Sequence, residues 1–276
     1  MNLSIEWNRD FLLHSPLFAP LHPVIARLST HHFPTLDELN ALLSAQHIAV
    51  QSGRELRFVA QGVGKLAFEA QYEPRCYLTG EVQTRRDNWH DLLNALVWLT
   101  YPKAKAAINT RHYHALTNRA AAAEGSSERG AVRDTNTLLD ESGVIVAYAD
   151  NELAGLLRSF QWHELFWQQR ERVKNSMGFY LFGHGLYEKG LQPYIGMTGQ
   201  GLLLPVEQDF FSWSVPRQHA HLDTLLADYL ADAQHCRSTR ELSPVPLLGV
   251  PGWSADNDCV RYYENTDYFR PGRREC

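Results

Sequence analysis

The stretch from Asp87 to Pro102, DNWHDLLNALVWLTYP, sets the local structure of the middle of the chain. A capping residue opens it and a proline closes it, since proline disfavours helical backbone at the preceding residue. At 3.6 residues per turn its leucines and valine cover one wide side and leave a narrow stripe opposite. That stripe carries His90, Asp91 and Asn94, with Trp98 and Tyr101 beside it. A solvated stripe normally carries Lys, Glu or Arg, so the run predicts a helix over 88–101 whose polar side lines a pocket.

A second helix is expected over Lys103–Ala123, directly after the first. Lys105, Asn109 and His112 occur at i, i+4 and i+7 and therefore share one face. Pro102 suits the first turn of this helix, where a missing amide hydrogen costs nothing, so the two helices meet at a sharp bend. The two polar faces then line one cleft. The substrate-binding residues expected there are Arg85, Asn94, Lys105, Asn109 and His112.

Two β-hairpins are predicted on either side of these helices. Alternating apolar residues over 55–60 indicate a half-buried strand, and a glycine-bearing turn at 62–64 separates it from a second run at 66–72. Over 137–148, the turn-forming residues Asp140–Gly143 lie between apolar runs, which is typical of a hairpin. Together the hairpins are expected to form a small, mostly antiparallel sheet.

The remaining segments are expected to be mainly helical. Prolines break residues 1–50 into short helices, one of which begins with a capping box at Thr35 and Glu38. Longer helices are predicted over 152–174 and 219–236, a polar loop over 124–130, and an extended tail over 243–276, rich in proline and aromatic residues and packed on the body. The predicted fold class is α+β, as one mainly helical domain over residues 1–276.

Composition narrows the classes of function. The 276 residues carry a net charge of −5, which argues against nucleic acid as a partner. The four cysteines form no CxxC pair, so neither a zinc ribbon nor a disulfide framework is indicated. No apolar run approaches the ~18 residues needed to span a bilayer, and the amino terminus does not resemble a secretory signal. We therefore expect a cytoplasmic protein that does not bind membranes.

Two further clusters carry chemically active side chains. Asp134 is a candidate metal ligand or general base, whereas Asp140 and Glu141 are assigned to turn chemistry. Around His184, flanking glycines permit close approach of the backbone to a ligand or tight packing, and His184 and Glu188 share a helical face. The sequence contains no GxSxG, HExxH or GxGxxG motif, and Gly64-Lys65 is followed by leucine, which excludes a P-loop.

The chain is similar to the bacterial domain-of-unknown-function family 3025. The resemblance rests on segments spread over most of the chain: Thr84-Arg85, Asn88–Asp91, Asn94–Trp98, Lys105, Asn109, His112, Asp134, Leu138, Asp140-Glu141, Phe182–His184, Tyr187-Glu188, Pro193, Gly249–Trp253 and Phe269–Pro271. It implies one family-wide unit and supplies no catalytic residue, cofactor or substrate.

Three hypotheses follow from these residues. The leading one is a hydrolase acting on a small anionic substrate, in which His90 or His184 is the general base and a divalent metal is optional, with its ligands not identified. The second is a metal-dependent nuclease or phosphohydrolase, with Arg85, Arg86 and Lys105 on phosphate. The third is a non-catalytic binding or scaffold protein whose polar clusters are buried hydrogen-bond networks. The catalytic residues expected under the first are His90, Asp91, Asp134, His184 and Glu188.

Overall fold

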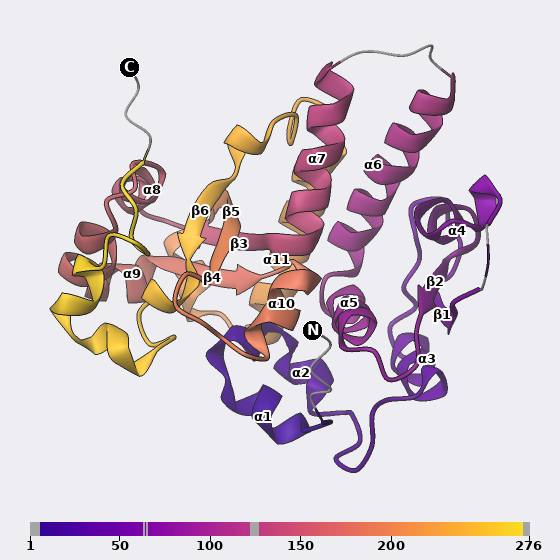
Figure 1. Ribbon diagram of the computed structural model, residues 1–276, viewed down its shortest axis with the longest axis horizontal. Helices are drawn as coiled ribbons and strands as arrows, with labels where there is room; N and C mark the ends of the chain where they lie inside the picture. Colours follow the sequence, from indigo (N-terminus) through magenta and orange to yellow (C-terminus); the bar gives the residue numbers. More distant parts are fainter. Residues whose placement is uncertain (1–5, 63, 65, 122–126, 273–276) are drawn as a thin grey trace.

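Strand β3 (Gly143–Tyr148), buried along its whole length, is at the centre of a four-stranded sheet in the computed structural model (Figure 1). The structure describes residues 6–62, 64, 66–121 and 127–272. The strand order is β4-β3-β5-β6, and β3 pairs antiparallel with β4 and parallel with β5. The other strands are β4 (Met177–Leu181), β5 (Thr198–Pro205) and β6 (Ser243–Pro246), the last antiparallel to β5. The fold is α+β, as predicted, but the sheet is mixed.

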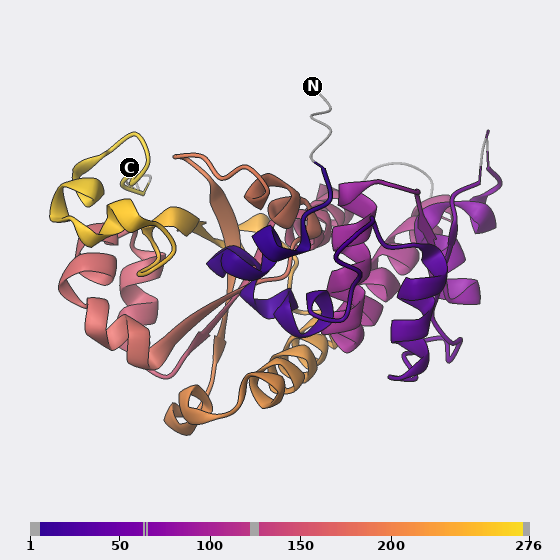
Figure 2. The ribbon, with the colours of Figure 1, turned by 90° about the horizontal axis from the view of Figure 1, so that it is seen from below.

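Helices cover both faces of this sheet. Helix α11 (Val215–Ala231) lies on one face, and α1 (Arg9–His14), α2 (His22–Ile25) and α10 (His184–Gly190) lie toward the other (Figure 2). Helices α8 (Asn151–Arg158) and α9 (Arg170–Ser176) lie at one end of the strands together with the C-terminal segment. Buried side chains from all these parts belong to one packed hydrophobic cluster.

The C-terminal segment is less extended than predicted. It begins with β6, where Pro244 and Pro246 are accepted because this is an edge strand. It then continues through short 3-10 turns. It contacts the sheet: the Tyr268 hydroxyl donates to the Met197 carbonyl at 2.8 Å and accepts from the Leu248 amide at 2.9 Å.

A smaller unit at the opposite end contains β1 (Arg57–Ala60), β2 (Glu81–Thr84), α3 (Leu36–Ser44) and α4 (Tyr72–Thr79). The predicted hairpin over 55–72 is wrong. Strand β1 pairs in parallel with β2, while residues 68–70 form a 3-10 turn and α4 starts at Tyr72. Four alternating residues identify a strand but not its partner. Gly80 makes this crossover possible, because its φ is 76° and a Cβ there would lie 2.1 Å from the Glu55 carbonyl oxygen.

Helices α5 (Trp89–Thr100) and α6 (Pro102–Ala121) confirm the helical predictions for the middle of the chain, the last two residues of the expected second helix lying outside the described ranges. The Asn88 side chain caps α5 by accepting from the Asp91 amide at 3.0 Å. The chain bends sharply at Pro102, and the Asp223 carboxylate accepts from the Ala104 amide at the start of α6 at 2.9 Å. No helix in the described part of the chain is long and apolar enough to cross a membrane.

The predicted hairpin over 137–148 is also wrong. Residues 127–142 form helix α7 (Ser127–Ser142), which lies beside α6 and leads directly into β3. The sequence Asp140–Gly143, at the junction between a helix and a strand, therefore has the same turn-forming composition as a hairpin turn. Of the predicted polar loop over 124–130, residues 124–126 lie outside the described ranges and 127–130 are helical.

Two other helix predictions had incorrect boundaries. The single helix expected over 152–174 is interrupted at Phe160, whose φ is 60°, and continues as a π-helical turn over Glu164–Gln168 before α9. The helix expected over 219–236 is displaced toward the amino terminus, because Pro216 is accepted in the first turn of α11. The capped helix at Thr35 is confirmed, with the reciprocal bonds of a capping box.

Candidate metal centre

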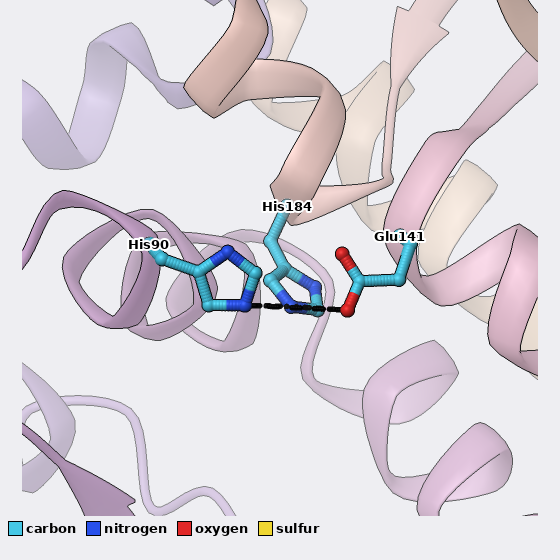
Figure 3. A group of neighbouring side chains, drawn as sticks. All are labelled: His90, Glu141 and His184. Atoms are coloured by element: carbon cyan, nitrogen blue, oxygen red, sulfur yellow. Dashed lines mark hydrogen bonds and ion pairs between the residues drawn. The ribbon is translucent and has the colours of Figure 1, made fainter. Parts of the chain in front are cut away.

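Side chains from the ends of three helices meet at one point (Figure 3). His90 lies in the first turn of α5, Glu141 in the last turn of α7, and His184 is the first residue of α10. The Nε2 atoms of His90 and His184 are 3.1 Å apart. Glu141 Oε1 lies 3.5 Å from His184 Nε2 and 4.0 Å from His90 Nε2. Three potential ligand atoms thus converge on one point.

Glycines beside His184 make this convergence possible. A Cβ on Gly183 would lie 2.4 Å from the Gly143 amide nitrogen, and one on Gly185 would lie 2.4 Å from Glu141 Oε2. Glycine at 183 is needed for the start of α10 to pack against this backbone, and a Cβ at 185 would displace the Glu141 carboxylate. The flanking glycines are therefore explained by packing between the two helices, which brings His184 next to Glu141.

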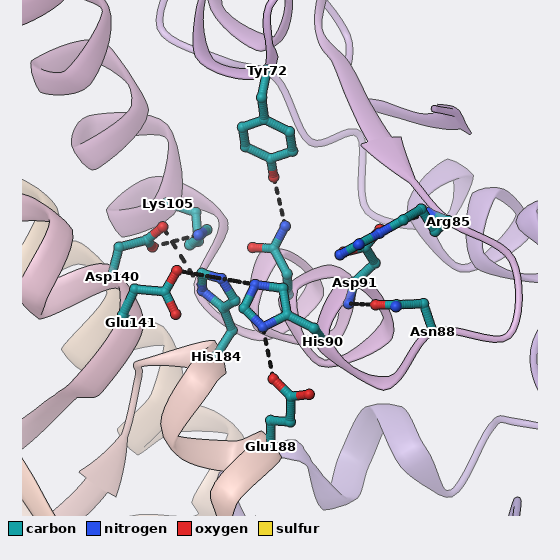
Figure 4. A network of polar contacts seen from close by, with 11 residues as sticks. Tyr72, Arg85, Asn88, His90, Asp91, Lys105, Asp140, Glu141, His184 and Glu188 are labelled. Atoms are coloured by element: carbon teal, nitrogen blue, oxygen red, sulfur yellow. Dashed lines mark hydrogen bonds and ion pairs between the residues drawn. The ribbon is translucent and has the colours of Figure 1, made fainter. Parts of the chain in front are cut away.

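Each histidine has a carboxylate near its other ring nitrogen (Figure 4). His90 Nδ1 lies 2.9 Å from Glu188 Oε2, and His184 Nδ1 lies 3.8 Å from Asp140 Oδ2. The first distance is a hydrogen bond, whereas the second is about 1 Å too long for one. Carboxylates in these positions favour a proton on each Nδ1, which leaves both Nε2 lone pairs directed at the point that Glu141 also faces.

Burial keeps His184 neutral. Only 7% of its side chain is exposed, and desolvation lowers the pKa of His184 to about 4 although Asp140 opposes this shift. Burial also raises the pKa of Glu141, partly offset by His90. A neutral imidazole is the form that binds a metal ion, so the buried histidine is ready to act as a ligand at neutral pH.

A polar cavity of about 240 Å³ adjoins the three ligand atoms. Besides them, its walls include Tyr72, Glu73, Arg85, Asp91, Asn94 and Asp140. Arg85 is bound to Asp91 by its amide, Nε and Nη2 at 2.7, 2.9 and 2.8 Å. Burial alone would raise the pKa of Asp91, but the hydrogen bonds from Arg85 outweigh it and lower that pKa. Asp91 is thus an ion-pair partner of Arg85.

A second group of ligand-type residues, Glu73, His112 and Asp140, lies beside the first. It lines an adjoining cavity of about 200 Å³ that shares Glu73, Asp140 and Glu141 with the first cavity. Lys105 lies among these residues, with Nζ 2.5 Å from Asp140 Oδ1 and 5.6 Å from the Trp98 ring centroid. Burial raises the pKa of the Asp140 carboxyl, but Lys105, His184 and His112 together outweigh it, Lys105 most of all, and bring that pKa to about 2.

The structure brings together most of the residues singled out in the sequence. His90, Asp91, Asn94 and Arg85 line the first cavity with His184, and Glu188 supports His90. Lys105, Asn109 and His112 share a face as predicted, yet they surround the second group, so the single expected cleft is two adjoining cavities.

Asp134 does not join this arrangement. Its carboxylate contacts Arg133 at 3.2 Å, and 63% of the side chain is exposed. Two helical turns, about 10 Å of axial rise, separate it from Glu141 on α7. The acidic residues that do reach the cavities from α7 are Asp140 and Glu141, which the sequence analysis assigned to a turn.

Glu73 and Tyr72 were missed altogether. Burial raises the pKa of Glu73, and Asn109 Nδ2 donates to its Oε2 at 2.5 Å. Both residues lie in the first turn of α4; Tyr72 was expected to end the strand over 66–72, and no element was predicted for Glu73. Recognition of Pro74 as a first-turn proline would have indicated this helix.

The comparisons with known proteins give a family and no activity. Residues 56–273 match the family described as "Protein of unknown function (DUF3025)". The chain belongs to the DUF3025 family. The match spans both groups of ligand-type residues and confirms the resemblance found from the sequence. Searches of curated proteins and of solved structures find no match.

Proposed function

We propose that this member of the DUF3025 family is a metal-dependent hydrolase whose ion is held by His90, Glu141 and His184. The supporting observation is the meeting of two histidine Nε2 atoms and one carboxylate oxygen, 3.1 to 4.0 Å apart. Tetrahedral zinc with bonds of 2.0–2.2 Å places its ligand atoms about 3.3 Å apart. An ion can therefore enter with shifts of at most about 0.7 Å in these separations.

The ligand set suits catalysis. Two histidines and a glutamate leave the fourth zinc position for water, and zinc lowers the pKa of that water to about 7. The first cavity is lined by the three ligand residues and would hold the substrate beside the ion. Glu73 lines the same cavity, and burial raises its pKa, so it is the candidate group for proton transfer there.

The charges of the walls weigh against the phosphohydrolase alternative. Of the three cations expected to bind phosphate, Arg85 is bound to Asp91 and Lys105 to Asp140, and Arg86 is not among the residues that line the first cavity. Under the scaffold alternative, a proton shared between the Nε2 atoms of His90 and His184 makes their contact a hydrogen bond. The proposal instead requires an ion at that point, and the two differ in whether metal binds.

Titration of the metal-free protein with Zn²⁺ in a calorimeter tests the proposal. We expect one tight ion per chain, and a loss of at least ~100-fold in affinity for His90→Gln and Glu141→Gln, because each removes a ligand. Both side chains are partly exposed, at 31% and 43%, so the variants should fold. The matched control is His112→Gln, which changes the histidine of the second group and should retain the ion.

Three outcomes would overturn the proposal. They are no zinc binding, equal binding by wild type and both ligand variants, and loss of the ion only in His112→Gln. Iron(II) is included in the titration, since the same ligand set holds iron in oxygenases. Tight iron binding without zinc binding would exclude a zinc hydrolase. A hydrolytic activity on ester and amide substrates should disappear with chelator and return with Zn²⁺.

A further inference from the structure

Asn94 is a buried amide on the wall of the first cavity. It follows His90 by one turn of α5, so the two side chains are neighbours on one helix face. Only 6% of the residue is exposed. Its Nδ2 donates to the Tyr72 hydroxyl at 2.6 Å, whereas its Oδ1 is buried and has no hydrogen-bond partner in the structure. A buried acceptor without a partner is unfavourable, and a donor on a bound ligand would offset that cost.

Tyr72 completes a pair of hydrogen-bonding groups. Its oxygen accepts from Asn94, so its own proton remains available to donate, and Tyr72 also lines the cavity. Burial raises the pKa of Tyr72 well above its ordinary value, which keeps it a phenol. If the Asn94 amide is turned over, the two residues exchange roles, and the pair still presents one donor and one acceptor.

The charges around this pair select against an anion. Arg85 is the cation among the described residues lining the cavity, and its Nε and Nη2 are held by Asp91. The other walls include the carboxyl groups of Glu73, Asp140 and Glu141. A phosphate or carboxylate ligand would lie close to these carboxyl groups, and apart from the metal no unpaired cation on the described walls would balance its charge. An uncharged group with both a donor and an acceptor fits the cavity better.

We propose that the substrate is a small, uncharged amide, bound by Asn94 and Tyr72 beside the ion. This inference rests on the proposed function and refines it. Water adds its oxygen to the carbonyl carbon, the carbon–nitrogen bond breaks, and the nitrogen leaves with a proton from that water, which gives a carboxylic acid and an amine without oxidation or reduction. The cavity of about 240 Å³ limits the bound part to less than a drug-sized molecule.

The test uses the full-length protein loaded with Co²⁺, whose visible spectrum reports ligands at the ion. Acetohydroxamate, an amide analogue that is neutral in solution and chelates a metal ion as its anion, and inorganic phosphate are titrated separately. We expect acetohydroxamate to bind at least tenfold more tightly than phosphate. Asn94→Leu should weaken acetohydroxamate at least tenfold, and Tyr72→Phe several-fold, because each removes a group that contacts it. Neither variant should change the spectrum of the cobalt protein without ligand.

Asn109→Leu provides the matched control, since it makes the same change in the second group. The Asn109 side chain donates to Oε2 of Glu73, a member of that group. This variant should leave acetohydroxamate affinity within twofold. Tighter binding of phosphate, or faster hydrolysis of p-nitrophenyl phosphate than of simple N-acetyl amines, would overturn the amide proposal. An unchanged affinity in Asn94→Leu would do the same. A normal cobalt spectrum in those experiments would leave the metal centre standing, so the two proposals fail separately.

Discussion

The two groups of ligand-type residues differ in how their charge is balanced. In the group His90, Glu141 and His184, the electron-rich atoms face one another at 3.1 to 4.0 Å. In the group Glu73, His112 and Asp140, the Lys105 ammonium already lies 2.5 Å from a carboxylate oxygen. The second group has a cation of its own in the fold, and the first depends on a proton or an ion from outside.

Asp140 connects the two groups. One carboxylate oxygen contacts Lys105, and the other faces His184 Nδ1 at 3.8 Å. Its neighbour Glu141 belongs to the first group, so consecutive residues at the end of α7 serve different groups. The comparison indicates that ligand-type side chains in proximity do not by themselves make a metal site. Whether a fixed cation such as Lys105 already lies among them decides if such side chains can bind a metal ion.

Lys105→Met should have the largest effect on stability. It would remove the cation of the second group, which would then depend on a proton or an ion from outside, as the first group does. The Lys105 side chain is 3% exposed, and removal of one partner of a buried ion pair costs about 3–5 kcal/mol. Urea denaturation should show a loss of that size in the free energy of unfolding, partly restored by Zn²⁺ at the vacated position. Lys103→Met, whose Nζ contacts the Thr224 hydroxyl at 2.9 Å, is the control and should change stability by less than about 0.5 kcal/mol. A loss below about 1 kcal/mol for Lys105→Met would show that Lys105 does not balance this group.

Acid should destabilise the metal-free first group in a defined range. The pKa of His184 is lowered to about 4 in the folded chain and is about 6.5 when unfolded. Between these values the unfolded chain binds the additional proton, so stability falls as the pH is lowered from 6.5 to 4. The shift corresponds to about 3 kcal/mol, at 1.36 kcal/mol per pKa unit, which His184→Asn should remove from the pH profile of urea denaturation in chelator.

His219→Gln is the matched control for that profile. Burial lowers the pKa of His219 to about 4 as well, so its loss should flatten the same pH range by a comparable amount. The two histidines differ in their neighbours, since His219 packs against the rings of Tyr101 and Tyr180. Zn²⁺ should therefore steepen the pH dependence of wild type and of His219→Gln, but not of His184→Asn. An equal response in all three proteins would argue against His184 as a ligand.

The parts of the site that the sequence could predict are those governed by local periodicity. The cap at Asn88 and the apolar side of α5 were sufficient to place His90 and Asn94 on one face. The pairing of β1 with β2 depends on contacts across more than twenty residues, which alternation within one strand does not encode. Turn preferences assigned Asp140 and Glu141 to a hairpin because a helix that ends immediately before a strand has the same local composition.

Glu188→Gln should produce the smallest of these effects, confined to the first group. Glu188 accepts from His90 Nδ1 at 2.9 Å, so it orients the ring without contacting the ion. Loss of its charge should lower Zn²⁺ affinity by about 10–100-fold, less than the removal of His90, because all three ligands remain. Its side chain is 47% exposed, so the melting temperature of the metal-free protein should not change, and Glu152→Gln, also exposed, is the control. An equal loss in Glu188→Gln and His90→Gln would mean that Glu188 is itself a ligand. An unchanged affinity would mean that the hydrogen bond to Glu188 does not set the orientation of His90.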